Sequence, residues 1–207
     1  MTIVSLKIEK SSGDGAVKAE FSDGSSLLLI QDYLFDGFDP ALWETGRELS
    51  STEEEAFRFA AACYRAEKAA LRLIARAEQN SLTLTAKLER RGFGAALVKA
   101  VVSRLLDRNL LDDARYAELW IRSHLSRKKA NSPRWLKISL GKRGIDRNST
   151  RTALEKTLDP ETEYALLLRF LEKAGHPNSK NYGYLRTQLK YEGFSTEVLD
   201  RYFDFFC

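Results

Sequence analysis

One short pattern occurs three times in the last two thirds of this chain: a leucine, a glycine four positions later, and then a bulky apolar residue. The three copies are Leu88 with Gly92-Phe93, Leu140 with Gly144-Ile145, and Leu189 with Gly193-Phe194. The glycines lie 52 and 49 residues apart, a period typical of one structural unit used repeatedly. A glycine in the left-handed conformation just past a helix lets the two apolar residues close a Schellman cap. The pattern therefore predicts three helices that end in the same way.

Two further helices flank each predicted cap. A stripe of apolar residues at helical spacing precedes each cap and another follows it. The residues Gly94, Asp146 and Ser195 are suited to the N-cap of the following helix. Helices of roughly 10 to 15 residues are not stable alone in water, so each unit needs its neighbours. We expect a mainly α-helical chain of three tandem three-helix repeats over residues 51–110, 111–158 and 159–207.

Residues 1–50 have a different pattern. Apolar residues alternate or cluster over residues 2–9, 16–22 and 27–30, and Asp23-Gly24 between the last two runs is a strong hairpin signal. A small antiparallel β segment is therefore predicted. Ser51 and Glu54 form a capping-box pattern at the start of a long helix that we expect to run to about Glu78 and to join the sheet to the first repeat.

The charge of the chain is divided unevenly. Residues 1–60 carry net −7, residues 61–158 carry net +13, and residues 159–207 carry net −2. A local positive field of this kind attracts a polyanion or an acidic protein face. A solvated surface of mixed charge is the alternative for any single basic stretch. The concentration of charge in the first two repeats favours binding.

Ten basic residues in these repeats are the candidate contacts for a partner. Four of them stand at predicted helix ends, where a cation also stabilises the helix dipole, so both roles are open. The densest run, around Arg127, is the best candidate for contact with DNA phosphates or acidic protein groups. The full set is Arg90, Arg91, Arg122, Arg127, Lys128, Lys129, Arg134, Lys137, Lys142 and Arg143.

Other conspicuous residues have a simpler interpretation. Asp112-Asp113 could hold a cation, but a carboxylate there is well placed to cap the next helix, and we favour capping. The C-terminal aromatic run of residues 202–206 could stack on nucleic-acid bases, but packing in the core is favoured. His124 is expected beside the apolar stripe of its helix, and two isolated histidines make no metal site.

Catalytic signals are missing from the sequence. It has no phosphate-binding loop, no HExxH motif, no paired CxxC and no nucleophile elbow, so we expect neither an enzyme nor a cofactor. Cys63 and Cys207 are expected to be free thiols. No stretch approaches 18 consecutive apolar residues and no signal peptide is evident, so a cytoplasmic location is expected.

The chain has an Asp-Asp-x-Arg-aromatic-Ala signature within residues 105–117, together with the segments 88–93, 133–136, 140–145 and, more loosely, 185–194. Taken in order, these segments resemble the RecX family, bacterial modulators of the RecA recombinase. At two places the chain departs from the family pattern: Asn131-Ser132 stands where members often have a glycine, and Tyr191-Glu192 replaces basic residues.

The resemblance implies an elongated crescent of three repeats that lodges in the groove of the RecA filament on single-stranded DNA. Members typically limit filament growth or promote disassembly, which damps strand exchange, ATP hydrolysis and the coprotease activity behind the SOS response. Some also bind DNA directly, so single-stranded DNA is an expected partner and double-stranded DNA a further candidate. A sequence-independent architectural DNA-binding protein is the alternative, and a helical scaffold for an acidic protein is a weaker one. A monomer is expected, because repeats within one chain already supply multivalency.

Overall fold

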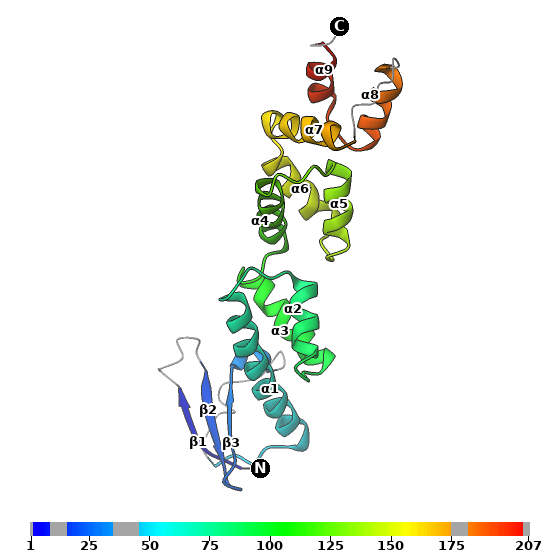
Figure 1. Ribbon diagram of the computed structural model, residues 1–207. Helices are drawn as coiled ribbons and strands as arrows, with labels where there is room; N and C mark the ends of the chain where they lie inside the picture. The colour runs from blue at the N-terminus through cyan, green and yellow to red at the C-terminus, as the bar shows by residue number, and fades with distance from the viewer. Residues whose placement is uncertain (1, 9–15, 35–45, 175–181, 205–207) are drawn as a thin grey trace. The chain divides into compact units, whose positions relative to one another are not determined.

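The computed structural model of the chain describes residues 2–8, 16–34, 46–174 and 182–204 (Figure 1). Within these residues the chain is mainly α-helical and has one three-stranded antiparallel sheet near the N-terminus. The expected fold class is therefore confirmed. Contacts divide the chain into two compact units, Met1–Glu78 with Thr83–Leu111, and Gln79–Leu82 with Asp112–Cys207. The boundaries of the three predicted repeats remain a prediction.

The sheet of the first unit contains β1 (Ile3–Ile8), β2 (Val17–Phe21) and β3 (Ser26–Leu29), in that order. A tight turn joins β2 to β3, with Gly24 at φ +78° and the Phe21 N–H donating to the Ser25 carbonyl over 2.9 Å. The hairpin signal at Asp23-Gly24 thus predicted the turn correctly.

Beyond the sheet, the described residues of the first unit form α1 (Ser51–Ile74), the main part of α2 (Ser81–Glu89), and α3 (Ala95–Asp107). A short 3₁₀ turn at Gln31–Tyr33 follows the sheet. Helix α1 lies against β3 and α3, and fully buried Phe57 meets Phe21 edge-on at 6.2 Å between ring centroids (Figure 1). The sheet and the first helices therefore share one core.

The predicted capping box at Ser51 is wrong by one residue. The N-cap is Ser50, whose side chain accepts from the Glu53 N–H while the Glu53 carboxylate accepts from the Ser50 N–H. Two overlapping Ser-x-x-Glu pairs occur here, and only Ser50 has the extended backbone that an N-cap requires. The helix also ends earlier than predicted, at Ile74.

In the described part of the second unit, six helices share one core. Asp112 accepts hydrogen bonds from the Ala114 and Arg115 N–H groups and so caps α4, as expected. Asp146 caps α6 in the same way, and Ser195 caps α9. The helices are α4 (Asp113–Ser126), α5 (Pro133–Gly141), α6 (Arg147–Thr157), α7 (Pro160–Ala174), α8 (Tyr182–Tyr191) and α9 (Thr196–Asp204).

All three predicted Schellman caps are present. Gly92, Gly144 and Gly193 have φ values of +87°, +79° and +90°. In each copy the residue after the glycine donates its N–H to the carbonyl of the leucine five positions earlier, over 3.2 to 3.3 Å. The six-residue pattern of the sequence therefore corresponds to one hydrogen-bonded helix ending used three times.

Several remaining expectations concern single residues. Cys63 is a free, buried thiol, and burial, with a further contribution from Glu67, raises its pKa to about 12. Tyr202 and Phe203 are buried in the core of the second unit, as expected. Residues 205–207 and His176 lie outside the described residues. No helix in the described part of the chain is both long and apolar enough to cross a membrane.

Candidate functional site

Eight of the ten predicted contact residues lie in the second unit, on α4, on α5 and on the segments that follow these helices. Arg90 and Arg91 follow α2 in the first unit. Most of the eight are exposed, while Arg134 and Arg143 are half-buried. The sequence thus located a run of cations on two successive helices of one repeat.

Two of the arginines at helix ends serve the helices themselves. The Arg90 Nε donates to the Ala86 carbonyl over 3.1 Å, and an Arg143 Nη donates to the Ser139 carbonyl over 2.8 Å. Each bond adds a side-chain donor to a carbonyl in a last helical turn, and the Ala86 carbonyl also accepts from the Arg90 backbone N–H over 3.2 Å. The helix-end interpretation therefore holds for these two residues, whereas neighbouring Lys142 is exposed.

Arg122 is partly neutralised by its own helix. Its guanidinium lies 3.0 Å from the Glu118 carboxylate one turn earlier, and Lys156 of α6 lies 3.9 Å from the same carboxylate. An ion pair of this kind, one helical turn apart, typically contributes about 0.3–0.5 kcal/mol to the stability of the fold. Arg122 is therefore available to a partner at low cost.

An aromatic cluster lies between α4 and α5. The ring centroids of Trp120, His124 and Trp135 are 4.9 to 6.2 Å apart, and their planes are within 32° of parallel. The Arg143 guanidinium lies 4.6 Å from the centroid of the Trp120 ring. Trp135 is 41% exposed even though it contacts His124. The cluster holds a large aromatic ring at the surface among basic residues.

His124 is the neutral centre of this cluster. The Asn131 side-chain amide donates to its Nε2 over 2.6 Å, which assigns the ring proton to Nδ1. Burial lowers the pKa of His124 below its ordinary value of 6.5, and the positive charges of Lys129, Arg127 and Arg143 lower it further. The imidazole is therefore uncharged near neutral pH, although cations surround it.

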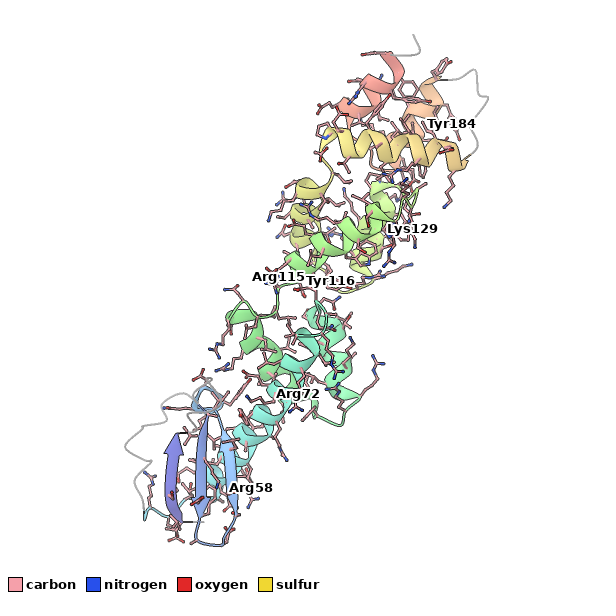
Figure 2. The ribbon with its side chains drawn as sticks, turned by 60° about the vertical axis from the view of Figure 1, so that its left-hand side comes forward. Arg58, Arg72, Arg115, Tyr116, Lys129 and Tyr184 are labelled. Carbon is pink, nitrogen blue, oxygen red and sulfur yellow. The ribbon has the colours of Figure 1, made fainter. Side chains whose placement is uncertain are left out.

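A hollow of about 780 Å³ opens beside Trp135. Figure 2 shows Lys129, which lies on the segment between α4 and α5 and lines this hollow. Helix α7 supplies further charged side chains from the next predicted repeat. The lining residues are His124, Lys128, Lys129, Ala130, Asn131, Trp135, Arg169, Glu172 and Lys173.

Sequence reasoning found Lys128 and Lys129 of this hollow but missed its other parts. Trp120 and His124 are four positions apart, so their shared helix face was predictable. The approach of Trp135 to that face was not, because it depends on the angle at which α5 packs on α4. Arg169 and Lys173 lie far along the chain, and no local pattern connects them to Lys129.

The second unit is thus a set of short helices in a shared core, with a basic and aromatic surface, which is the architecture of a helical-repeat protein. The sequence model described as "RecX, second three-helix domain" matches residues 112–154, which span α4, α5 and most of α6.

Known proteins agree with this match. The chain is 36% identical over 115 residues to the Regulatory protein RecX of Treponema pallidum, which covers 56% of this chain and 70% of that protein. It is 33% identical over 139 residues to the one of Pseudomonas entomophila, covering 65% and 86% of the two chains. A crystal structure of regulatory protein RecX has the same fold, with a TM-score of 0.65 at 19% identity over 96% of this chain and 97% of that one. The chain belongs to the RecX family, a family of regulatory proteins.

Proposed function

We propose that this protein regulates the RecA recombinase by binding the RecA filament on single-stranded DNA, and that it lowers the filament's activity. The observation that carries the proposal is the run of exposed cations on α4 and α5, in the part of the chain that the RecX domain model matches. Binding of this kind needs neither a cofactor nor a catalytic group. The proposal includes a monomer that acts in the cytoplasm and damps recombination, DNA repair and the SOS response.

The ten cationic residues are the proposed contacts with the recombinase or with its DNA. Their charges suit phosphates and acidic side chains alike. Arg122 and the lysines after α4 project charge from one end of α4, whereas Lys137 and Lys142 do so from α5. Arg90 and Arg91 add two cations in the first unit. Contacts from several repeats on one chain add avidity without requiring any one of them to be tight.

The test is co-sedimentation of the full chain with RecA filaments on single-stranded DNA. The variant Arg127→Ala/Lys128→Asn/Lys129→Ala removes three charges. Asparagine is used at position 128 because Lys128 has φ +51°, a conformation that asparagine tolerates well. We expect weaker filament binding with an unchanged helical content. Unchanged affinity would remove this run from the contact surface.

The matched control removes three other exposed cations from the same unit, Arg147, Arg151 and Lys156 of α6, by alanine substitution. It changes the net charge by the same amount, so a loss of filament binding confined to the first variant shows a local contact.

Binding to naked DNA falls steeply with salt when several phosphates are neutralised. Filament binding that follows naked-DNA affinity at every salt concentration would favour the architectural DNA-binding alternative instead.

A further inference from the structure

Trp135 combines exposure with rigidity. Although 41% of the residue is exposed, its ring packs on the His124 ring with 4.9 Å between the centroids. His124 is in turn fixed by Asn131 and by Trp120. A ring held in this way loses little conformational freedom when something stacks on it, so binding to it carries a small entropic cost.

The hollow beside this ring is strongly positive. Its lining includes four cationic side chains, Lys128, Lys129, Arg169 and Lys173, against the single carboxylate of Glu172. Arg169 is positioned by hydrogen bonds to the carbonyls of Ala165 and Leu125. Among the residues that the structure describes, none of the three lysines forms an ion pair. Positive charge is therefore concentrated beside an available aromatic ring.

We infer that this hollow is a stacking site for an unpaired nucleobase of a single-stranded nucleic acid, with Trp135 against the base and Lys128, Lys129 and Lys173 near the adjoining phosphates. Its volume of about 780 Å³ falls in the range of about 300–1,000 Å³ that is usual for small-molecule sites. An aromatic ring beside a basic groove is the combination by which proteins bind single strands without regard to sequence. The inference rests on the proposed function and deepens it, because it assigns an unpaired base to Trp135 beside Lys128 and Lys129, which are already proposed as contacts.

Single-stranded nucleic acid fits this surface better than the other classes of partner. Bases within a duplex are already stacked on one another and present only their edges. A protein partner with an apolar face would leave the cations of the hollow without counter-charges. An unpaired nucleotide satisfies both parts of the site, because it carries an aromatic base and an anionic phosphate.

The test compares the affinity of the full chain for two labelled strands of equal length, oligothymidylate and an abasic strand with the same number of phosphates. We expect oligothymidylate to bind about 5-fold tighter or more, because this is the gain in affinity that stacking of a single base provides. Equal affinities in the wild-type protein would overturn the inference without any variant.

Variants then assign the base to Trp135. Trp135→Ala is expected to abolish the preference for oligothymidylate and to keep the affinity for the abasic strand. Trp135→Phe keeps a ring beside His124 and is expected to retain a smaller preference, which covers the case in which the alanine variant does not fold. The control Ile138→Ala removes another exposed apolar side chain, 49% exposed, from the same helix and is expected to change neither affinity.

Two results would contradict the assignment. A full preference for oligothymidylate in Trp135→Ala and Trp135→Phe would place the base elsewhere. Loss of RecA-filament binding in Trp135→Ala, with oligonucleotide binding unchanged, would make this surface a protein contact. Either result leaves the proposed function standing, because that proposal is tested on the filament itself.

Discussion

The Ser132 hydroxyl donates a hydrogen bond to the Glu192 carboxylate over 2.5 Å, which joins the start of α5 to the end of α8. At the same place the Arg134 N–H donates to the Glu192 carbonyl over 2.9 Å, and the Arg134 guanidinium lies 3.8 Å from the centroid of the Tyr191 ring. We expected departures from the RecX pattern at Ser132, Tyr191 and Glu192. In the structure these three residues contact the start of α5 or the end of α8 and together form a joint between the second and third predicted repeats.

The joint predicts coupled losses of stability. Ser132 is 2% exposed and also accepts from the Trp135 N–H as the N-cap of α5, so Ser132→Ala is expected to cost about 1–2 kcal/mol. Glu192→Ala leaves the buried hydroxyl without its acceptor. A double-mutant cycle by urea denaturation is expected to give a coupling of about 0.5 kcal/mol or more. Additive losses in the double variant would mean that the two side chains do not interact in solution.

The cap glycines are predicted to differ in their tolerance of a side chain. Gly92 has open space around it, so Gly92→Ala is expected to cost only the left-handed strain, about 1–2 kcal/mol, and Gly92→Val more. A Cβ on Gly144 would lie 2.9 Å from the Leu82 side chain, so Gly144→Ala should cost more than Gly92→Ala. Thermal and urea denaturation measure the loss of stability in the variants at both glycines.

Gly141 provides the control for these variants. It is the last residue of α5, it has ordinary helical backbone, and nothing lies within 4 Å of an added Cβ. Gly141→Ala is therefore expected to leave stability unchanged or to raise it by about 0.5–1 kcal/mol. Equal losses at positions 141 and 144 would show that left-handed strain and crowding are not what distinguish these sites.

A buried ionic network is predicted to support the first unit. The Arg104 guanidinium, whose side chain is 10% exposed, lies 3.1 Å from the buried carboxylate of Glu67, which also accepts from the Tyr33 hydroxyl. Glu67→Ala leaves a buried cation without its main partner and is expected to cost about 3–5 kcal/mol by denaturation. Asp32 contacts the same guanidinium but is exposed, so Asp32→Ala should cost less than about 1 kcal/mol. Similar losses for the two variants would contradict this account.

The folded protein is predicted to become less stable as the pH is lowered, because of His124. Burial and neighbouring cations lower its pKa in the folded protein, so the unfolded chain takes up a proton first as the pH falls. The stabilising contribution is fully present above the ordinary pKa of 6.5 and decreases as the pH drops through and below that value. In the variant His124→Gln, the free energy of unfolding is expected to depend less on pH between about pH 7.5 and 5.5, which is above the range in which carboxylates titrate. An identical slope in the variant would assign the effect to other groups.

What the sequence predicted well was local. The caps at Gly92, Gly144 and Gly193 depend on residues within one turn of each other, and so do the N-caps at Asp112 and Asp146. The error at Ser51 is also local, because two equivalent patterns overlap and only the backbone geometry of the preceding loop decides between them. Periodicity and capping chemistry therefore predict which helices form and how they end.

What the sequence could not predict depends on packing between helices. Trp135 and Arg169 come together at one hollow because α5 and α7 pack in one core, and no spacing along the chain encodes their approach. The pairing of Ser132 with Glu192 is of the same kind, since 60 residues separate them. The charge pattern gave the region of the candidate site, whereas the arrangement of its side chains required the structure.

ATP hydrolysis by RecA on single-stranded DNA, titrated with this protein at moderate salt, tests the central claim most directly. Binding to the naked DNA is measured in parallel under the same conditions. The account predicts that hydrolysis falls at protein concentrations that leave naked DNA unbound, and that the Arg127→Ala/Lys128→Asn/Lys129→Ala variant requires a higher concentration. Hydrolysis that stays constant until the DNA itself is saturated with protein would contradict regulation through the filament.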